Sequence, residues 1–238
     1  MKVGFVGLGD MGLGMTKNLV AAGFEVTGYD VREARVAMLA EAGGKGAQTC
    51  RAVGAASEAV FVMVMTGQQL YDVVADENGL LAGLQPGGAI IVSATVKPSE
   101  VRAIEAAATA AKVALIDTPV SGGRPGAEGG TLTMMVAATP ELLAAHRPLF
   151  EAVGKNIIHV GETIGMGQTV KATLQGIIGA SFAGIFEALV LGAKAGVKGE
   201  TLFEVAHSRW ARGLDHDVAV GSRVPKPDEV GQFIVDSL

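Results

Sequence analysis

Three glycines near the N-terminus have the spacing of a phosphate-binding turn. They lie in the run Gly7-Leu8-Gly9-Asp10-Met11-Gly12, which follows a strand-like segment and opens a helical pattern. Glycine permits the tight turn and the close backbone approach that a pyrophosphate requires, and the N-terminus of the next helix carries partial positive charge. The string GxGxxG alone is a weak signal, but in this context it predicts that the whole run binds a dinucleotide cofactor.

An acidic residue stands where this fingerprint needs one. Asp30 ends the next strand-like segment, about 20 residues after the glycines, where a carboxylate accepts hydrogen bonds from the adenosine ribose and repels a 2′-phosphate. NAD is therefore favoured over NADP, and Arg32 is the nearby residue that would soften this preference. The alternative is that the glycines only make a turn and Asp30 only caps a helix. That alternative is more credible for Asp30 than for the glycines.

Lys171 and Gln175 form a second candidate group. They are four residues apart on a predicted helix, so they share a face and can reach one bound molecule. Taken alone, a solvated lysine near a helix start is the ordinary interpretation of Lys171.

A metal site is not predicted. The four histidines show no ligand spacing with Cys50 or with a carboxylate cluster. Cys50 is better explained as a small buried residue than as a nucleophile.

The elements that must position these residues alternate between strands and helices up to about Val160, as in a parallel sheet covered by helices. The predicted strands are Lys2 to Val6, Glu25 to Tyr29, Ala59 to Met65, Ala89 to Val92, Val113 to Ile116, Leu132 to Val136 and Ile157 to Val160. The predicted helices between them are Gly12 to Ala22, Arg32 to Ala42, Gln68 to Ala75, Pro98 to Ala111 and Pro140 to Phe150.

A second domain is predicted after Gly161, where the strand patterns have stopped. Gly167 to Gly196 has the pattern of one long helix with several small residues. Its apolar stretch is interrupted by Glu187 and Lys194, which favours a buried helix over a membrane span. The predicted fold is an α/β protein: a Rossmann-type doubly wound sheet over residues 1–161, followed by a smaller all-helical domain over residues 162–238.

Composition narrows the possible partners and the compartment. The 238 residues include 34 glycines and 49% hydrophobic residues, enough for a full core, and the net charge of -5 gives no attraction to nucleic acid or to an anionic membrane. A single cysteine cannot close an internal disulfide, and no signal-peptide pattern opens the chain. A cytoplasmic protein with a small-molecule substrate is the simplest expectation.

Three segments together resemble the beta-hydroxyacid dehydrogenases, which include 3-hydroxyisobutyrate, tartronate semialdehyde, L-threonate and 6-phosphogluconate enzymes. The first is the glycine run followed by Asn18-Leu19. The second is Asp117-Thr118-Pro119-Val120-Ser121-Gly122-Gly123, similar to the family's substrate-binding motif. The third is Gly165-Met166-Gly167-Gln168-Thr169-Val170-Lys171, similar to the segment that carries the family's catalytic lysine.

The resemblance implies a fold and further cofactor contacts. A Rossmann domain would be joined to a helical domain that completes a homodimer or homotetramer. Thr95 falls where the family has a cofactor-contacting threonine. Val64 and Met65 fall at the end of the predicted strand Ala59 to Met65, which corresponds to the family's fourth strand. There the family's backbone passes the cofactor, and the usual Leu-Pro pair is replaced by Met65-Thr66.

The resemblance also implies a reaction, hydride transfer between NAD and a small 3-hydroxy acid. Lys171 would act as the acid/base, since a lysine whose ammonium form is disfavoured by burial can accept the hydroxyl proton. Ser121, Gly122 and Gly123 would hold the substrate carboxylate, and Gln175 would bond substrate oxygens. The family more often has asparagine at this last position, and the longer amide is similar to the L-threonate dehydrogenase branch.

Two alternative functions remain open. The first is a semialdehyde reductase that runs the same chemistry in the opposite direction. The second is a non-catalytic, NAD(H)-binding oligomeric module. The segment Phe233 to Leu238 resembles the start of a helix that continues in family members, so the helical domain is expected to be shortened and to bury its apolar surface by oligomerising.

Overall fold

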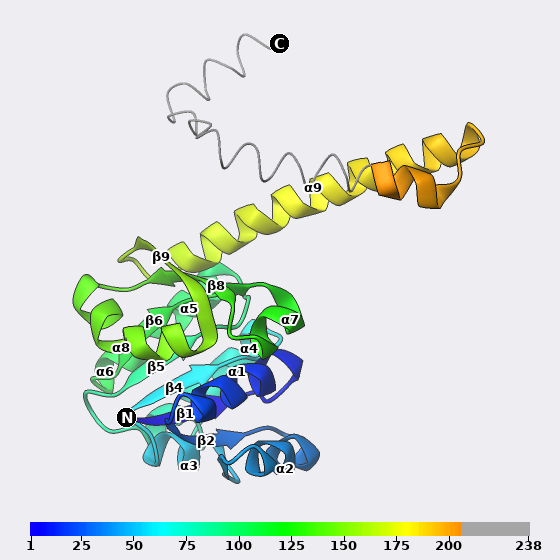
Figure 1. The fold of residues 1–238 in the computed structure, drawn as a ribbon. Helices are drawn as coiled ribbons and strands as arrows, with labels where there is room; N and C mark the ends of the chain where they lie inside the picture. The colour runs from blue at the N-terminus through cyan, green and yellow to red at the C-terminus, as the bar shows by residue number, and fades with distance from the viewer. Residues whose placement is uncertain (206–238) are drawn as a thin grey trace. The chain divides into compact units, whose positions relative to one another are not determined.

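The structure, a computed structural model, describes residues 1–205, in which strands and helices alternate (Figure 1). The strands are β1 (Lys2–Val6), β2 (Glu25–Tyr29), β3 (Lys45–Gly46), β4 (Ala59–Val62), β5 (Ala89–Val92), β6 (Ala114–Asp117), β7 (Val120–Ser121), β8 (Leu132–Ala137) and β9 (Gly154–Gly161). The helices are α1 (Asp10–Ala21), α2 (Glu33–Glu41), α3 (Cys50–Ala55), α4 (Gly67–Ala75), the 3-10 turn η1 (Leu80–Ala82), α5 (Pro98–Ala103), α6 (Glu105–Ala110), α7 (Gly123–Glu128), α8 (Pro140–Val153) and α9 (Met166–Lys194).

Within residues 1–205, nine strands form one sheet in the order β3-β2-β1-β4-β5-β6-β8-β7, with β9 paired to β8. The run from β3 to β6 is parallel and has the doubly wound order of dinucleotide-binding domains. β8 is antiparallel to β6 and β7, so the wholly parallel sheet expected from the sequence ends at β6. Because β1 lies between β2 and β4, the strand order reverses direction there, and a ligand crevice is expected at the carboxyl ends of these strands.

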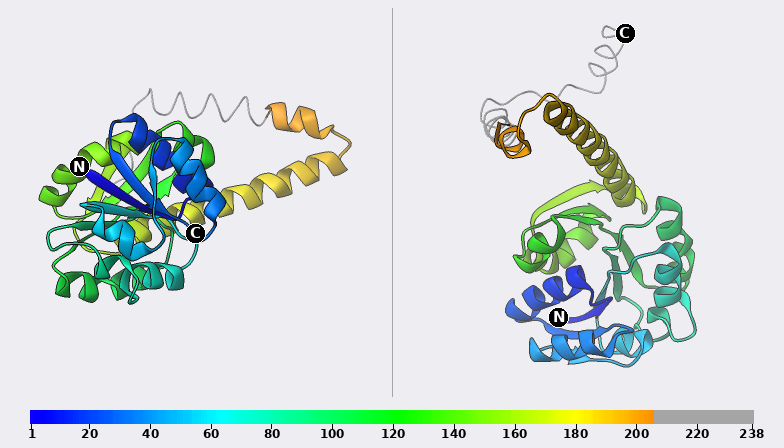
Figure 2. Two further views of the ribbon diagram at one scale, coloured as in Figure 1. Left: turned by 90° about the horizontal axis from the view of Figure 1, so that it is seen from below. Right: turned by 90° about the vertical axis from the view of Figure 1, so that its right-hand side faces the viewer.

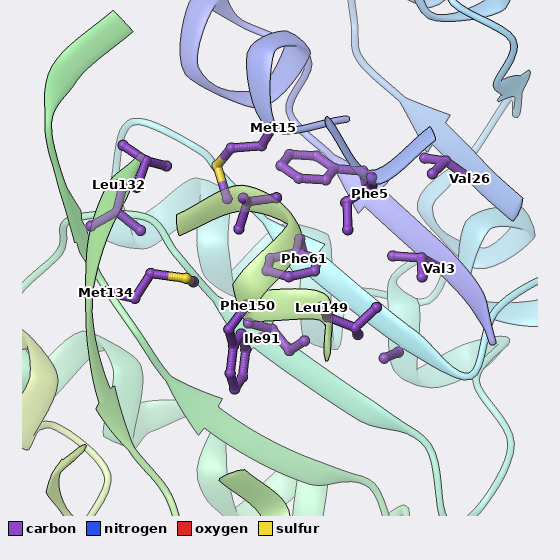
Figure 3. Packing of buried hydrophobic residues seen from close by; sticks show 14 of the residues in the cluster. Val3, Phe5, Met15, Val26, Phe61, Ile91, Leu132, Met134, Leu149 and Phe150 are labelled. Carbon is purple, nitrogen blue, oxygen red and sulfur yellow. The ribbon is translucent and has the colours of Figure 1, made fainter. Parts of the chain in front are cut away.

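The sheet is buried on both faces, and helices cover both (Figure 2). Phe61 belongs to the apolar cluster on one face, while its neighbours Val60 and Val62 belong to the cluster on the other. On the first face the rings of Phe5 and Phe61 stack with centroids 5.5 Å apart, and Phe150 of α8 meets Phe61 edge-on at 6.5 Å (Figure 3). This two-sided burial explains why the parallel strands are continuous apolar runs in the sequence.

Some element boundaries differ from the sequence-based expectations. β4 ends at Val62, not at Met65, because the Val62 carbonyl accepts from both Ser93 N and Ala94 N, which ends the regular ladder. The predicted helix Pro98 to Ala111 is two helices, α5 and α6, separated at Ile104. Strands β3 and β7 and helices α3 and α7 were not predicted.

Helix α9 starts against the sheet. Gly167 is buried there: a side-chain carbon at this position would lie 2.7 Å from the Met135 carbonyl oxygen and 2.9 Å from that of Asp117. The first compact unit of the chain ends at Gly176, within this helix, and the second begins at Ile177. The predicted domain boundary near Gly161 stays a prediction.

Beyond Gly176 several apolar side chains of α9, among them Ile177, Phe182 and Phe186, are exposed within residues 1–205, where the sequence predicted a buried helix. By length and a mean hydropathy of 1.8, α9 could cross a membrane, a test that core helices of soluble proteins also pass. The segment Phe233 to Leu238 lies outside the described residues.

Candidate active site

The glycine turn joins β1 to α1 in a conformation that other residues cannot adopt. Gly7 has φ +92°, and a side-chain carbon there would overlap the Met63 carbonyl. At Gly12 a side-chain carbon would overlap the Gly7 carbonyl, so the first helical turn can lie directly on the loop. Gly9 is the N-cap residue of α1 and provides no side-chain cap. The first-turn N–H groups and the helix dipole are therefore suited to phosphate oxygens.

Asp30 ties the turn to the end of β2. Its Oδ2 accepts a hydrogen bond from Leu8 N at 2.8 Å, and its Oδ1 accepts from Arg32 N at 2.9 Å and from Arg32 Nε at 3.3 Å. The side chain is only 7% exposed. Each carboxylate oxygen has two acceptor sites, so Oδ2 can still receive a ribose hydroxyl while it holds the loop.

A cavity of about 740 Å³ opens beside this turn, within the size range of small-molecule sites. Of the predicted cofactor residues it is lined by Gly7, Gly9, Asp10, Asp30, Val64 and Met65. Leu8 and Met11 belong instead to the apolar core or pack against it. The lining residues that sequence analysis missed include Arg35, Thr49, Gln69, Asp72, Asp76 and Asn78.

Charged side chains at the cavity are paired with one another. Asp10 accepts from Arg35 Nη2 at 2.8 Å, and Arg32 is held by Asp30. Asp72 and Asp76 add two further carboxylates to the lining. Because both arginines already face a carboxylate, the cavity offers little unneutralised positive charge to an additional phosphate.

Lys171 lies on the first turns of α9 and is 7% exposed. Burial lowers the pKa of its ammonium group below the ordinary value of 10.5. No ion pair to this lysine is found within residues 1–205. A buried lysine without a carboxylate partner is easier to deprotonate, which is what a general base requires.

A buried amide and a buried carboxylate, which the sequence analysis did not single out, hold the start of α9. Asp117, at the end of β6, accepts from Gly165 N at 2.9 Å, from Gln168 N at 3.2 Å and from Gln168 Nε2 at 2.9 Å. Burial raises the pKa of Asp117, while the bonds from Gln168 and Gly165 act in the opposite direction. The available signals were that Asp117, like Asp30, directly follows a predicted strand and that Gln168 stands three residues before Lys171.

The Ser121-Gly122-Gly123 segment lies at a turn that requires glycine. Gly122 and Gly123 have φ +131° and +59°, both in the left-handed region. The following helix, α7, is held on α1 because Asn18 Nδ2 donates to the Ala127 carbonyl at 2.7 Å. The segment that leads into the turn also touches the start of α9, since a side-chain carbon at Gly167 would lie 2.9 Å from Pro119 Cδ.

Two further predicted site residues are exposed to solvent and do not line the cavity. Thr95 is exposed in the loop after β5, and Gln175 is exposed on α9 one turn beyond Lys171. The structure thus assembles the glycine turn with Asp30, and it joins the Lys171 segment to the segment that precedes Ser121. Within residues 1–205 neither Thr95 nor Gln175 forms a hydrogen bond with Lys171, and their assignments remain predictions.

Within the part of the chain that the structure describes, no three histidine, cysteine, aspartate or glutamate side chains are close enough to hold a metal ion. Cys50 is half-buried and lines the cavity beside the glycine turn, where burial raises the pKa of its thiol to about 11. The neutral thiol is a poor nucleophile, in line with its prediction as a packing residue.

Comparison with known proteins agrees with this arrangement. Residues 2–161 match the profile of the NAD binding domain of 6-phosphogluconate dehydrogenase. The chain is 34% identical over 236 residues to 2-(hydroxymethyl)glutarate dehydrogenase of Eubacterium barkeri, covering 99% of this chain and 78% of that protein. It is 37% identical to NAD-dependent L-serine dehydrogenase of Pseudomonas aeruginosa, covering 86% and 68%.

A solved structure has the same fold. Mycobacterium tuberculosis 3-hydroxyisobutyrate dehydrogenase with L-serine superposes with a TM-score of 0.78 at 32% identity, over 86% of this chain and 69% of that one. The chain belongs to the beta-hydroxyacid dehydrogenase family. Its first 161 residues accordingly include a domain that binds a nicotinamide cofactor.

Proposed function

We propose that this oxidoreductase oxidises a small 3-hydroxy acid, using NAD as the hydride acceptor and Lys171 as the base. One observation carries the assignment. Lys171 is only 7% exposed, and burial lowers the pKa of its ammonium group. It lies near the start of α9, which is hydrogen-bonded to the loop after β5 at the edge of the dinucleotide-binding sheet. Lys171 would take the proton from the substrate hydroxyl oxygen. The hydride would leave the carbon that bears this hydroxyl and pass to the bound nicotinamide. In the reverse direction Lys171 returns the proton.

The preference for NAD is supported by the charges around the ribose end of the cavity. Asp30 is buried and fixed, and both arginines in the lining are paired with carboxylates. A 2′-phosphate would meet the Asp30 carboxylate and would have to draw Arg32 away from it.

The proposed substrate class is the chemical group that the substrates named for the relatives share. 2-(Hydroxymethyl)glutarate, L-serine and 3-hydroxyisobutyrate each carry a hydroxyl on the carbon β to a carboxylate. We assign the carboxylate to Ser121 and the backbone of Gly122 and Gly123, whose left-handed turn exposes main-chain groups at close range. Gln175 would add an amide contact.

A substrate panel tests the proposal. NADH or NADPH formation is followed with a set of 3-hydroxy acids, and its consumption with the matching semialdehydes, for the wild-type chain and for Lys171→Ala. We expect turnover of at least one β-hydroxy acid with NAD, and its loss in the variant. Binding of NADH without turnover of any panel member would instead support the non-catalytic module, and turnover restricted to semialdehydes would support a reductase.

A further inference from the structure

The side chain of Gln168 joins three segments that are distant in the sequence. Its Nε2 donates to the Ala94 carbonyl at 3.0 Å and to Asp117 Oδ1 at 2.9 Å, and its Oε1 accepts from Val96 N at 3.0 Å. Gln168 itself is 1% exposed. One amide therefore connects α9, the end of β6 and the loop after β5.

The two bonds to the β5 loop enclose Thr95. Ala94 and Val96 are the residues directly before and after it, so Gln168 fixes the backbone on both sides of this exposed threonine. On α9, Lys171 is three residues beyond Gln168, about one helical turn along the same side. The same side chain thus sets where the lysine-bearing turn stands relative to the Thr95 loop.

We propose that Gln168 is a positioning residue for hydride transfer. It holds Lys171 at a fixed position relative to the loop that carries Thr95, at the nicotinamide end of the cofactor site. The proposal rests on the proposed function, because it assigns Lys171 the proton transfer. Asp117 is its partner: its carboxylate accepts hydrogen bonds from Nε2 of Gln168 and from the main-chain N–H groups of Gly165 and Gln168.

The geometry requires a glutamine. Both N–H bonds of the amide point at acceptors, and the oxygen meets a donor, so the orientation of the group is fully determined. A glutamate would place an oxygen against the Ala94 carbonyl and the Asp117 carboxylate. An asparagine is one methylene shorter and cannot span the same three groups. A methionine fills the space but forms none of these bonds.

We call the three hydrogen bonds of the Gln168 side chain the clamp. Its loss would affect the reaction through the position of Lys171. Without it, the first turns of α9 can shift relative to the β5 loop, and a displacement of about 1 Å at a reacting group can cost roughly a hundredfold in rate. A shifted lysine would also be better solvated, so its pKa would rise toward the ordinary value and the acidic limb of the oxidation profile would move to higher pH. A general loss of folded protein lowers the rate without moving that limb.

The test compares Gln168→Met with Thr169→Ala in the full chain. Thr169 is a matched control, because it lies on the same turn and its hydroxyl donates to the carbonyl of Gly165, the residue just before α9, at 2.8 Å. For each variant we would measure kcat and KM against pH, NADH affinity and the thermal unfolding midpoint. Gln168→Met should lower kcat at least tenfold and shift the acidic limb upward, with NADH affinity changed less than threefold. Thr169→Ala should do neither.

Two results would overturn the positioning role: wild-type kcat in Gln168→Met, or a lowered kcat with an unshifted limb. If the methionine variant does not fold, Gln168→Asn is judged by the same two criteria. Lys171→Ala separates this proposal from the proposed function. Full turnover in Lys171→Ala would refute the base assignment itself, whereas an inactive Lys171→Ala beside an unperturbed Gln168→Met would refute only the clamp.

Discussion

The carboxylate of Asp30 accepts a hydrogen bond of 2.8 Å from the backbone N–H of Leu8, 22 residues earlier in the chain. The residue that we propose to recognise the adenosine ribose therefore also fixes the glycine turn that we propose to bind the pyrophosphate. A change at Asp30 has two consequences, one on the specificity for the cofactor and one on the shape of the turn.

Asp30→Asn should reduce the preference for NAD over NADP by about tenfold, because it removes the negative charge that repels a 2′-phosphate. The turn should keep its shape, since the amide oxygen can still accept the hydrogen bond from Leu8 N. The measurement is the affinity for NADH and NADPH in the wild type and the variant. Arg32→Ala is the companion variant: it should weaken any binding of NADPH and change NADH affinity little. Equal affinities for the two cofactors in the wild type would mean that Arg32, not Asp30, governs this end of the cavity.

Lys171→Ala should lower turnover by roughly a hundredfold or more while NADH binding stays near the wild-type value, since it removes positioned acid/base catalysis and leaves the glycine turn intact. Lys171→Arg should be similarly impaired, because arginine keeps its proton at any working pH. Steady-state kinetics and NADH titration on the same preparations check both statements. An alanine variant that retains most of its turnover would remove Lys171 from the mechanism.

The pH dependence of oxidation should follow the buried lysine. Burial lowers the pKa of Lys171 below 10.5, and the base must be neutral to accept a proton, so kcat/KM for the hydroxy acid should rise with pH through that lowered pKa. The reverse reduction needs the protonated form and should fall over the same range. Profiles recorded in both directions test the sign. An oxidation limb at the ordinary lysine value would mean that the amine is solvated in the working enzyme.

Two glycines with similar backbone angles provide a stability test of the turn. Gly7 and Gly23 have φ +92° and +87°, but a side-chain carbon at Gly7 would overlap the Met63 carbonyl, whereas at Gly23 it would meet nothing within 4 Å. Gly23→Ala should cost only the left-handed strain, about 1–2 kcal/mol. Gly7→Ala should lower the free energy of unfolding by clearly more and weaken NADH binding. Denaturant unfolding of both variants makes the comparison, and equal losses would contradict the structure of the turn.

The nucleotide-binding half was the most predictable part of the chain. The strands Lys2–Val6, Glu25–Tyr29 and Ala89–Val92 have the expected bounds, because each is a short segment with β-branched or aromatic residues that is bounded by turns. The end of β4 was not predictable: Met63 to Met65 are as apolar as the strand, and only the two donors that converge on the Val62 carbonyl stop it.

Tertiary contacts account for other features that were not predicted. Helix α7 is rich in glycine and contains Pro125, a composition typical of a loop, and it is held against α1 by Asn18. Gln168 stood within a recognised motif, but the pattern of a helix does not say that its amide reaches Ala94 and Asp117, residues 74 and 51 positions away. The sequence could therefore indicate candidate site residues, but it could not show which hydrogen bonds hold them relative to one another.

The apolar surface of α9 supports a prediction of self-association. Ile177, Phe182 and Phe186 are 61%, 54% and 63% exposed within residues 1–205, and the two phenylalanine rings lie 6.2 Å apart. Exposed apolar side chains concentrated along one helix are typical of an interface. We therefore expect a homodimer or homotetramer in solution, with this stretch of α9 in the contact.

Sedimentation velocity on the wild type, on Phe186→Glu and on a control variant tests this expectation. A charge in a closely packed apolar interface is costly, so Phe186→Glu should shift the distribution toward the monomer and make the shift concentration-dependent. Gln85→Glu is the control: it adds the same charge at an exposed position before β5 and should leave the oligomer unchanged. A wild-type chain that sediments as a monomer at all concentrations, or a Phe186→Glu variant that associates like the wild type, would show that this face of α9 is not the subunit contact.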